Sequence, residues 1–291
     1  MSSDETLTLR ALGREVQYRR LSVHTPDGLS IAAQDWRQKS SGRDVLLIHG
    51  FSQSHLAWLK QVSGPLASEY RLVTYDIRGH GESDKPLEPH YYREPERWAG
   101  EVAAVIQQAQ LDRPVLIFWS YAGRIALDYL GQHGDSAISG LVFVNATSRA
   151  DATVLGPATP LLRAMTQGDL ATNIEATSRL LAASTARPLP EEEVRFMLAY
   201  NMVVPPAIRA NLTGRPADYD ATLRRIRVPV LALHGSEDAI NLPAMADHTC
   251  ATVPNARKII YPGVGHMPFW ETPETFARDV SEFLRTAPIV R

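Results

Sequence analysis

The sequence predicts an α/β protein, in which a mostly parallel β-sheet carries helices on both faces. Two observations indicate this class. Short continuous apolar runs, typical of strands that are buried on both faces, recur along the chain. Segments whose apolar residues follow helical spacing separate these runs, and such alternation favours a parallel sheet covered by helices.

The composition is that of an ordinary globular protein, with 44% hydrophobic and 21% charged residues among 291. The formal net charge is -2 and the signs are interleaved, so no basic block indicates a nucleic-acid partner. Cys250 is the single cysteine, which excludes an internal disulfide, and no Cys/His cluster has zinc-ligand spacing. Without a signal-peptide stretch or a long apolar run, we expect a cytoplasmic protein that does not span a membrane.

The chain opens with an expected β-hairpin, because alternating runs at 20–25 and 29–36 flank the turn Pro26-Asp27-Gly28. Residues 1–18 are polar and mixed, a pattern compatible with a short helix. Buried strands are predicted at 45–48, 71–75, 115–118, 140–144, 228–233 and 258–261. Helices are predicted at 96–110, 123–134 and 273–285.

Residues 149–222 break this alternation, because they contain helical patterns without strands. The expected helices lie at 161–166, 170–184, 191–202 and 206–212, with proline-containing joints between them. We therefore predict a sheet-based core formed by residues 1–148 and 223–291. Residues 149–222 form a helical cap over the top edge of the sheet.

A serine nucleophile is indicated directly after the run that begins at Val115. The chain passes through Trp119 into Ser120, and helical spacing begins immediately afterwards. Such a turn lifts a serine hydroxyl above the sheet and sets the positive end of a helix beside it. Serine is also a favoured helix N-cap, so a purely structural role for Ser120 stays open.

Two backbone N–H groups are candidates for an oxyanion hole. His49-Gly50-Phe51 follows the strand at 45–48, and a sharp turn there would present the N–H of Phe51. The N–H of Tyr121 would point to the same place from the start of the helix. Two donors of this kind stabilise the charge of a tetrahedral intermediate. The alternative is an ordinary strand-to-helix loop in which His49 is a structural hydrogen-bonding residue.

Asp238 and His266 complete a candidate catalytic triad. Asp238 follows the strand at 228–233, and ligand sites of open α/β sheets gather at such strand ends. Glu237 is a weaker competitor for the role of the acid. His266 follows the last strand and lies downstream of both other candidates, in the order Ser, Asp, His. An imidazole can take and return the serine proton near neutral pH, and a carboxylate fixes its tautomer.

These segments resemble the α/β-hydrolase superfamily, in its serine-nucleophile branch, along nearly the whole chain. The resemblance is carried by Leu47-Ile48-His49-Gly50-Phe51, by residues 75–84 (Tyr-Asp-Ile-Arg-Gly-His-Gly-Glu-Ser-Asp), by the Ser120 turn, by residues 234–238 and by Gly265-His266. It implies an α/β-hydrolase fold, the triad of Ser120, Asp238 and His266, and neither cofactor nor metal. The chain departs from the G-x-S-x-G motif at both glycines: Ala122 replaces the second and is small enough, whereas Phe118 replaces the first and crowds the turn.

The resemblance further implies a hydrolase of small carboxylic esters or lactones that works through an acyl-enzyme. Haloalkane dehalogenases and epoxide hydrolases of this fold use an aspartate nucleophile, which the serine at position 120 argues against. Carbon–carbon hydrolases and cofactor-free perhydrolases share the triad and stay open. A ligand-binding relative without turnover also stays open, since Phe118 disturbs the motif.

The expected partner is a small molecule with an apolar acyl part. Trp119, Trp58 and Met267 are candidates for lining its pocket, and Arg124 is expected to cap or pair on the helix surface. The sequence sets neither the physiological substrate nor the oligomeric state, and a homodimer is one of the states left open.

Overall fold

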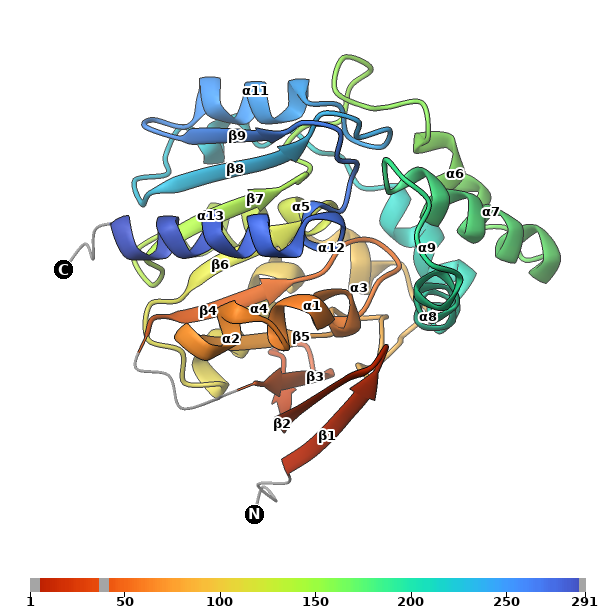
Figure 1. Cartoon of the computed structure of the whole chain (residues 1–291), viewed down its shortest axis with the longest axis horizontal. Helices are drawn as coiled ribbons and strands as arrows, with labels where there is room; N and C mark the ends of the chain where they lie inside the picture. Colours follow the sequence, from red (N-terminus) through yellow and green to blue (C-terminus); the bar gives the residue numbers. More distant parts are fainter. Residues whose placement is uncertain (1–5, 37–41, 288–291) are drawn as a thin grey trace.

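A nine-stranded sheet runs through the part of the chain that the computed structural model describes, residues 6–36 and 42–287. Its strand order is β1-β2-β3-β5-β4-β6-β7-β8-β9 (Figure 1). The strands are β1 (Thr6–Ala11), β2 (Arg14–His24), β3 (Ser30–Asp35), β4 (Asp44–Ile48), β5 (Arg71–Tyr75), β6 (Val115–Trp119), β7 (Gly140–Val144), β8 (Val230–Gly235) and β9 (Arg257–Tyr261). The strands from β5 to β9 pair in parallel, as predicted, and β1, β2 and β3 form an antiparallel edge.

The first strand corrects one expectation. The hairpin of β2 and β3 is confirmed, but the segment compatible with a short helix is instead β1, which pairs antiparallel with the start of β2. Leu12 and Gly13 form the two-residue turn between them, with φ of 50° and 70°. A two-residue hairpin turn with positive φ at both positions usually carries Asn-Gly or Asp-Gly. Leucine at the first position is therefore an unusual signal for such a turn.

Alternation along the central strands divides the core into two layers. Leu46 and Ile48 of β4 pack with α4 (Pro95–Gln108), α5 (Ala122–His133) and α11 (Ala244–Thr252). Val45 and Leu47 face the opposite way. The helices on that second face are α1 (Leu59–Val62), α2 (Pro65–Glu69), α12 (Pro268–Glu271) and α13 (Pro273–Thr286). Because both faces are covered, the strands read as continuous apolar runs.

The segment from 149 to 222 contains helices and, apart from two isolated bridges, no strand pairing. Its helices are α6 (Thr159–Ala164), α7 (Leu170–Ala183), α8 (Glu191–Met202), α9 (Pro206–Thr213) and the beginning of α10 (Asp220–Leu223). Figure 1 shows α6 to α9 gathered beyond one end of the sheet. Residues of this segment share a cavity with Ser120, which follows β6, so the helices lie at the carboxyl ends of the parallel strands. Within the described ranges, no helix has the length and apolar character needed to cross a membrane.

Candidate active site

Ser120 occupies a strained turn between β6 and α5. Its φ is +56°, a conformation that few residues other than glycine adopt. Backbone hydrogen bonds hold the turn: the N–H of Ser120 donates to the oxygen of Val144 at 3.1 Å. The oxygen of Ser120 in turn accepts from the N–H groups of Gly123 at 3.0 Å and Thr147 at 2.9 Å. Strain of this kind persists only where the surroundings fix it, and it concentrates at functional sites.

The bulky Phe118 does not prevent this turn. Its side chain lies on the α5 face of the sheet and meets Phe143 edge to face, with ring centroids 4.5 Å apart. The close approach that the turn requires occurs instead at Gly123. A Cβ atom added there would lie 2.5 Å from the oxygen of Thr147.

Replacing Gly123 with alanine is therefore expected to destabilise the protein by about 1–3 kcal/mol, the usual cost of overpacking a tight site. Gly131 on the same helix is the matched control, because a Cβ there would meet only Thr222 Oγ1 at 3.5 Å. Gly131→Ala should be neutral or stabilising by up to about 1 kcal/mol. Denaturant unfolding measures both changes. Equal stability of the two variants would contradict the packing described at Gly123.

A second turn, at His49 and Gly50, packs directly against Ser120. A Cβ atom on Gly50 would lie 3.0 Å from the Cβ of Ser120, so glycine permits this approach. The imidazole of His49 supports the turn, because Nε2 accepts from the N–H of Ile77 at 3.1 Å while Nδ1 lies 2.9 Å from the oxygen of Gly50. Burial lowers the pKa of His49 to about 4, so the ring is neutral and structural.

The N–H groups of Phe51 and Tyr121 donate to no other group in the described ranges. Both residues are 7% exposed, and both line the cavity that contains Ser120. Buried backbone N–H groups are nearly always paired in native proteins. These two amides are therefore free to donate to a ligand bound in the cavity.

The carboxylate of Asp238 is held from two sides. Oδ1 accepts from the backbone N–H groups of Ile240 at 2.8 Å and Asn241 at 3.0 Å. Oδ2 lies 2.7 Å from Nδ1 of His266, the partner that the sequence predicts. The competitor Glu237 is exposed, and its carboxylate accepts from the Ser236 hydroxyl.

Two further residues contact Asp238, and the sequence did not single them out. Asn145 Nδ2 donates to Oδ2 at 2.7 Å and to the oxygen of Gly265 at 3.3 Å, and His234 Nε2 lies 3.2 Å from Oδ2. Burial alone would raise the pKa of Asp238, but His266 and His234 outweigh it and hold that pKa below its ordinary range. The carboxylate thus keeps its negative charge at neutral pH. Asn145 directly follows β7, and this position at a strand end was the available signal.

His266 is fixed by its backbone against Trp119, the residue that precedes Ser120. Its N–H donates to the oxygen of Ser184 at 2.9 Å, and its oxygen accepts from Trp119 Nε1 at 2.9 Å. The ring centroids of Trp119 and His266 lie 5.6 Å apart. The hydroxyl of Ser120 forms no hydrogen bond within the described ranges, and catalytic hydrogen bonds are often long before a substrate binds. Ser120, Asp238 and His266 thus come from separate parts of the chain to one end of the sheet.

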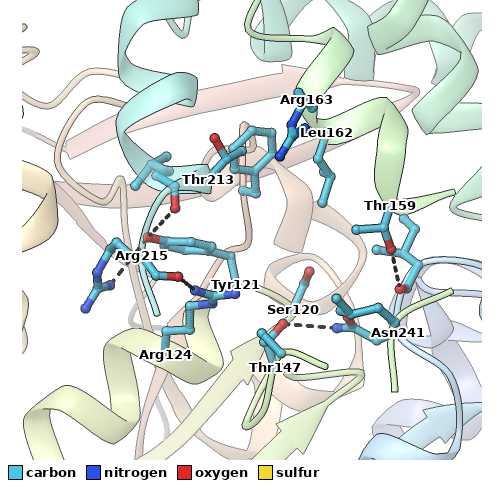
Figure 2. A pocket seen from close by; sticks show the side chains of 15 residues that line it. Ser120, Tyr121, Arg124, Thr147, Thr159, Leu162, Arg163, Thr213, Arg215 and Asn241 are labelled. Atoms are coloured by element: carbon cyan, nitrogen blue, oxygen red, sulfur yellow. Dashed lines mark hydrogen bonds between the residues drawn. The ribbon is translucent and has the colours of Figure 1, made fainter. Parts of the chain in front are cut away.

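A cavity of about 320 Å³ opens above Ser120. It is lined by residues of the sheet end and of the segment from 149 to 222, among them Leu155, Leu162 and Leu212. Figure 2 shows Leu162 and Thr159 on one wall of it. Trp119, Trp58 and Met267 do not line it, which corrects their predicted role. All three are at most 2% exposed and belong to the core on the α13 face of the sheet.

The chain matches the model of the alpha/beta hydrolase fold family over residues 45–273. An esterase from Rhodococcus sp. ECU1013 has a similar solved structure, with a TM-score of 0.87 and 32% identity over 92% of this chain and 99% of that one. The solved structure of a candidate aryl esterase from Burkholderia cenocepacia gives a TM-score of 0.88. Its sequence is 32% identical, and the match covers 92% of this chain and 98% of that one. A bifunctional esterase/perhydrolase of Acinetobacter calcoaceticus is 25% identical over 279 residues, 91% of this chain and 99% of its own.

Proposed function

The chain belongs to the α/β-hydrolase fold family, and from that premise we propose that it is a serine esterase with Ser120, His266 and Asp238 as its catalytic triad. The observation that carries this proposal is the strained Ser120, set in a cavity with two unpaired amides. The 2.7 Å contact between His266 and a charged carboxylate supports it. The two solved esterases at 32% identity support the ester-cleaving class.

The first half of the proposed reaction forms an acyl-enzyme. His266 Nε2 takes the proton of the Ser120 hydroxyl as the oxygen attacks the ester carbonyl, because a serine hydroxyl is a weak nucleophile without a base. The amides of Phe51 and Tyr121 donate to the oxyanion that forms. Asp238 fixes the tautomer of His266 and stabilises its protonated form. The tetrahedral intermediate then collapses, and His266 gives the proton to the departing alcohol.

The second half releases the acid. A water molecule replaces the alcohol, His266 removes its proton, and the resulting hydroxide attacks the acyl carbonyl. The same two amides stabilise the second oxyanion, and the proton returns from His266 to Ser120. The inserted helices α6 to α9 act as a cap that encloses this chemistry from the carboxyl side of the sheet.

Hydrolysis of p-nitrophenyl esters tests this function. The cavity of about 320 Å³ is at the small end of ligand sites, so we expect acetate and butanoate esters to turn over faster than the dodecanoate. Release of p-nitrophenol is followed in the wild type and in His266→Ala. Ester hydrolysis that persists unchanged without His266 would refute the proposed mechanism.

Perhydrolysis is a second candidate on the same groups, because the relative at 25% identity from Acinetobacter calcoaceticus carries both activities in its name. Here the acyl-enzyme formed from acetate would be attacked by hydrogen peroxide in place of water, giving peracetate. Peracetate formation without cleavage of simple esters would favour this candidate. Binding of ligand with no turnover of any of these compounds would instead favour a ligand-binding protein.

A further inference from the structure

The cavity above Ser120 holds positive charge that none of its lining residues neutralises. Arg124, Arg163 and Arg215 line it, whereas no aspartate or glutamate does. Among the described residues, only Arg215 of these three forms an ion pair, with the buried Asp128. Arg124 and Arg163, which form no ion pair among the described residues, therefore bring positive charge to the cavity that contains Ser120 (Figure 2).

Arg124 lies on α5, four residues after Ser120, where it is half-buried and lines the cavity as well as pairing on the helix surface. Its Nη1 donates to the backbone oxygens of Arg215 and, at 3.4 Å, Pro216. Its Cζ lies 5.6 Å from the centroid of the Tyr121 ring. These contacts fix the guanidinium without neutralising it, because they come from carbonyl groups and a π-face.

Two nitrogen atoms of the Arg124 guanidinium have no hydrogen-bond acceptor among the described residues. Its Nε is buried without a partner, and its Nη2 donates to no group in the described ranges. Burial lowers the pKa of Arg124 below its ordinary value, and the neighbouring Asp128 raises it too little to offset that effect. Unsatisfied donors on a buried charge are costly, so an anionic acceptor bound here would be strongly favoured.

Arg163 approaches the cavity from a different element. It belongs to α6 of the inserted helices, is exposed, and its side chain makes no hydrogen bond or ion pair within the described ranges. Figure 2 shows Arg163 and Arg124 on different walls of the cavity. One anion in the cavity would thus be attracted from both the sheet side and the cap side.

We infer that the preferred substrate carries a carboxylate, which Arg124 binds while Ser120 attacks an ester in the same molecule. The inference rests on the proposed ester hydrolysis and refines the expectation of a purely apolar acyl part. Arg124 and Ser120 line the same cavity of about 320 Å³, so a substrate that reaches both must be small, such as the half-ester of a short dicarboxylic acid. The reaction consumes one half-ester and one water and yields the dicarboxylate, the alcohol and one proton.

The test compares monomethyl adipate with methyl hexanoate, which share a six-carbon acyl chain and differ in a terminal carboxylate. Proton release in a pH-stat gives kcat/KM for both esters in the wild type, Arg124→Gln and Arg195→Gln. Arg195 is the matched control, since its side chain is 71% exposed on α8 and pairs with Glu191. We expect Arg124→Gln to lower the preference for the adipate ester about 10- to 100-fold, the loss of one charge-assisted hydrogen bond. Arg195→Gln should keep the wild-type preference.

A second measurement needs only the wild type and so does not depend on the folding of a variant. Raising sodium chloride from about 20 mM to about 500 mM should raise KM for the adipate ester and not for the hexanoate ester, because salt screens the attraction. An unchanged preference in folded Arg124→Gln, or equal salt dependence of the two esters, would overturn the inference while leaving ester hydrolysis intact. If neither ester nor any p-nitrophenyl ester is cleaved, the proposed function itself fails.

Discussion

Ser120→Ala is expected to lower kcat for ester hydrolysis by about 10⁵- to 10⁶-fold, the loss seen when a triad nucleophile is removed. Without the hydroxyl no acyl-enzyme can form, and only the oxyanion donors and substrate binding remain. Stability should change little, because the Ser120 hydroxyl makes no hydrogen bond among the described residues. Alanine also accepts the existing turn with no added bulk.

Ser139→Ala is the control for this experiment. Like that of Ser120, the hydroxyl of Ser139 has no hydrogen-bond partner among the described residues, but Ser139 is buried and precedes β7, at the opposite end of the strand from the site. Its kcat should equal that of the wild type. Initial rates with p-nitrophenyl butanoate and melting temperatures of both variants make the comparison. Ser120→Ala with more than a tenth of the wild-type rate would exclude Ser120 as the nucleophile.

His266→Ala is expected to lower kcat about as much as Ser120→Ala, and the double variant should fall no further. The reason is that serine and histidine act as one unit: neither contributes once the other is missing. Asp238→Asn should lower kcat by a smaller factor, about 10⁴-fold. The amide supports the wrong tautomer of His266 but leaves the base in place.

Burst-free steady-state rates of the two single variants and the double variant measure this coupling. His133→Ala is the control, since His133 is exposed at the end of α5 and stacks on Tyr129. Losses in the double variant that multiply those of the single variants would mean that Ser120 and His266 act independently. The proposed proton transfer between them would then be wrong.

The sheet was predictable from the sequence because its strands are buried on both faces and separated by clear helical spacing. Several elements escaped, and two of them, β1 and α11, did so for physical reasons that the sequence shows. β1 has a half-exposed, mixed pattern, and its Leu12-Gly13 turn lacks the Asn-Gly or Asp-Gly signal of a tight hairpin. α11 carries small and polar residues without an apolar stripe, so its sequence gives no periodic signal.

The candidate site was predictable from the sequence where its residues follow the ends of strands. Ser120 and Asp238 come after β6 and β8, and the parallel order brings those ends together. Trp119 was wrongly expected in the pocket because it neighbours Ser120 in the chain. However, Trp119 belongs to β6 as its last residue. The alternation of side chains along the strand directs it to the α13 face of the sheet.

The position of Arg124 in the cavity wall could not be predicted from residue spacing alone. Its position on α5 is compatible with a solvated helix surface, and only the chain at Arg215 and Pro216, folded over it, makes it a wall of the cavity. Likewise, Asn145 contacts Asp238 across 93 residues of sequence, a separation over which no local pattern extends.

Labelling with a fluorophosphonate, followed by peptide mass spectrometry, tests the central claim most directly, because the reagent phosphonylates only an activated serine. The wild type should carry one adduct, located on Ser120, and His266→Ala should label far more slowly. An adduct on another serine, or an unlabelled Ser120 in a protein that still cleaves esters, would contradict the assignment of Ser120 as the nucleophile.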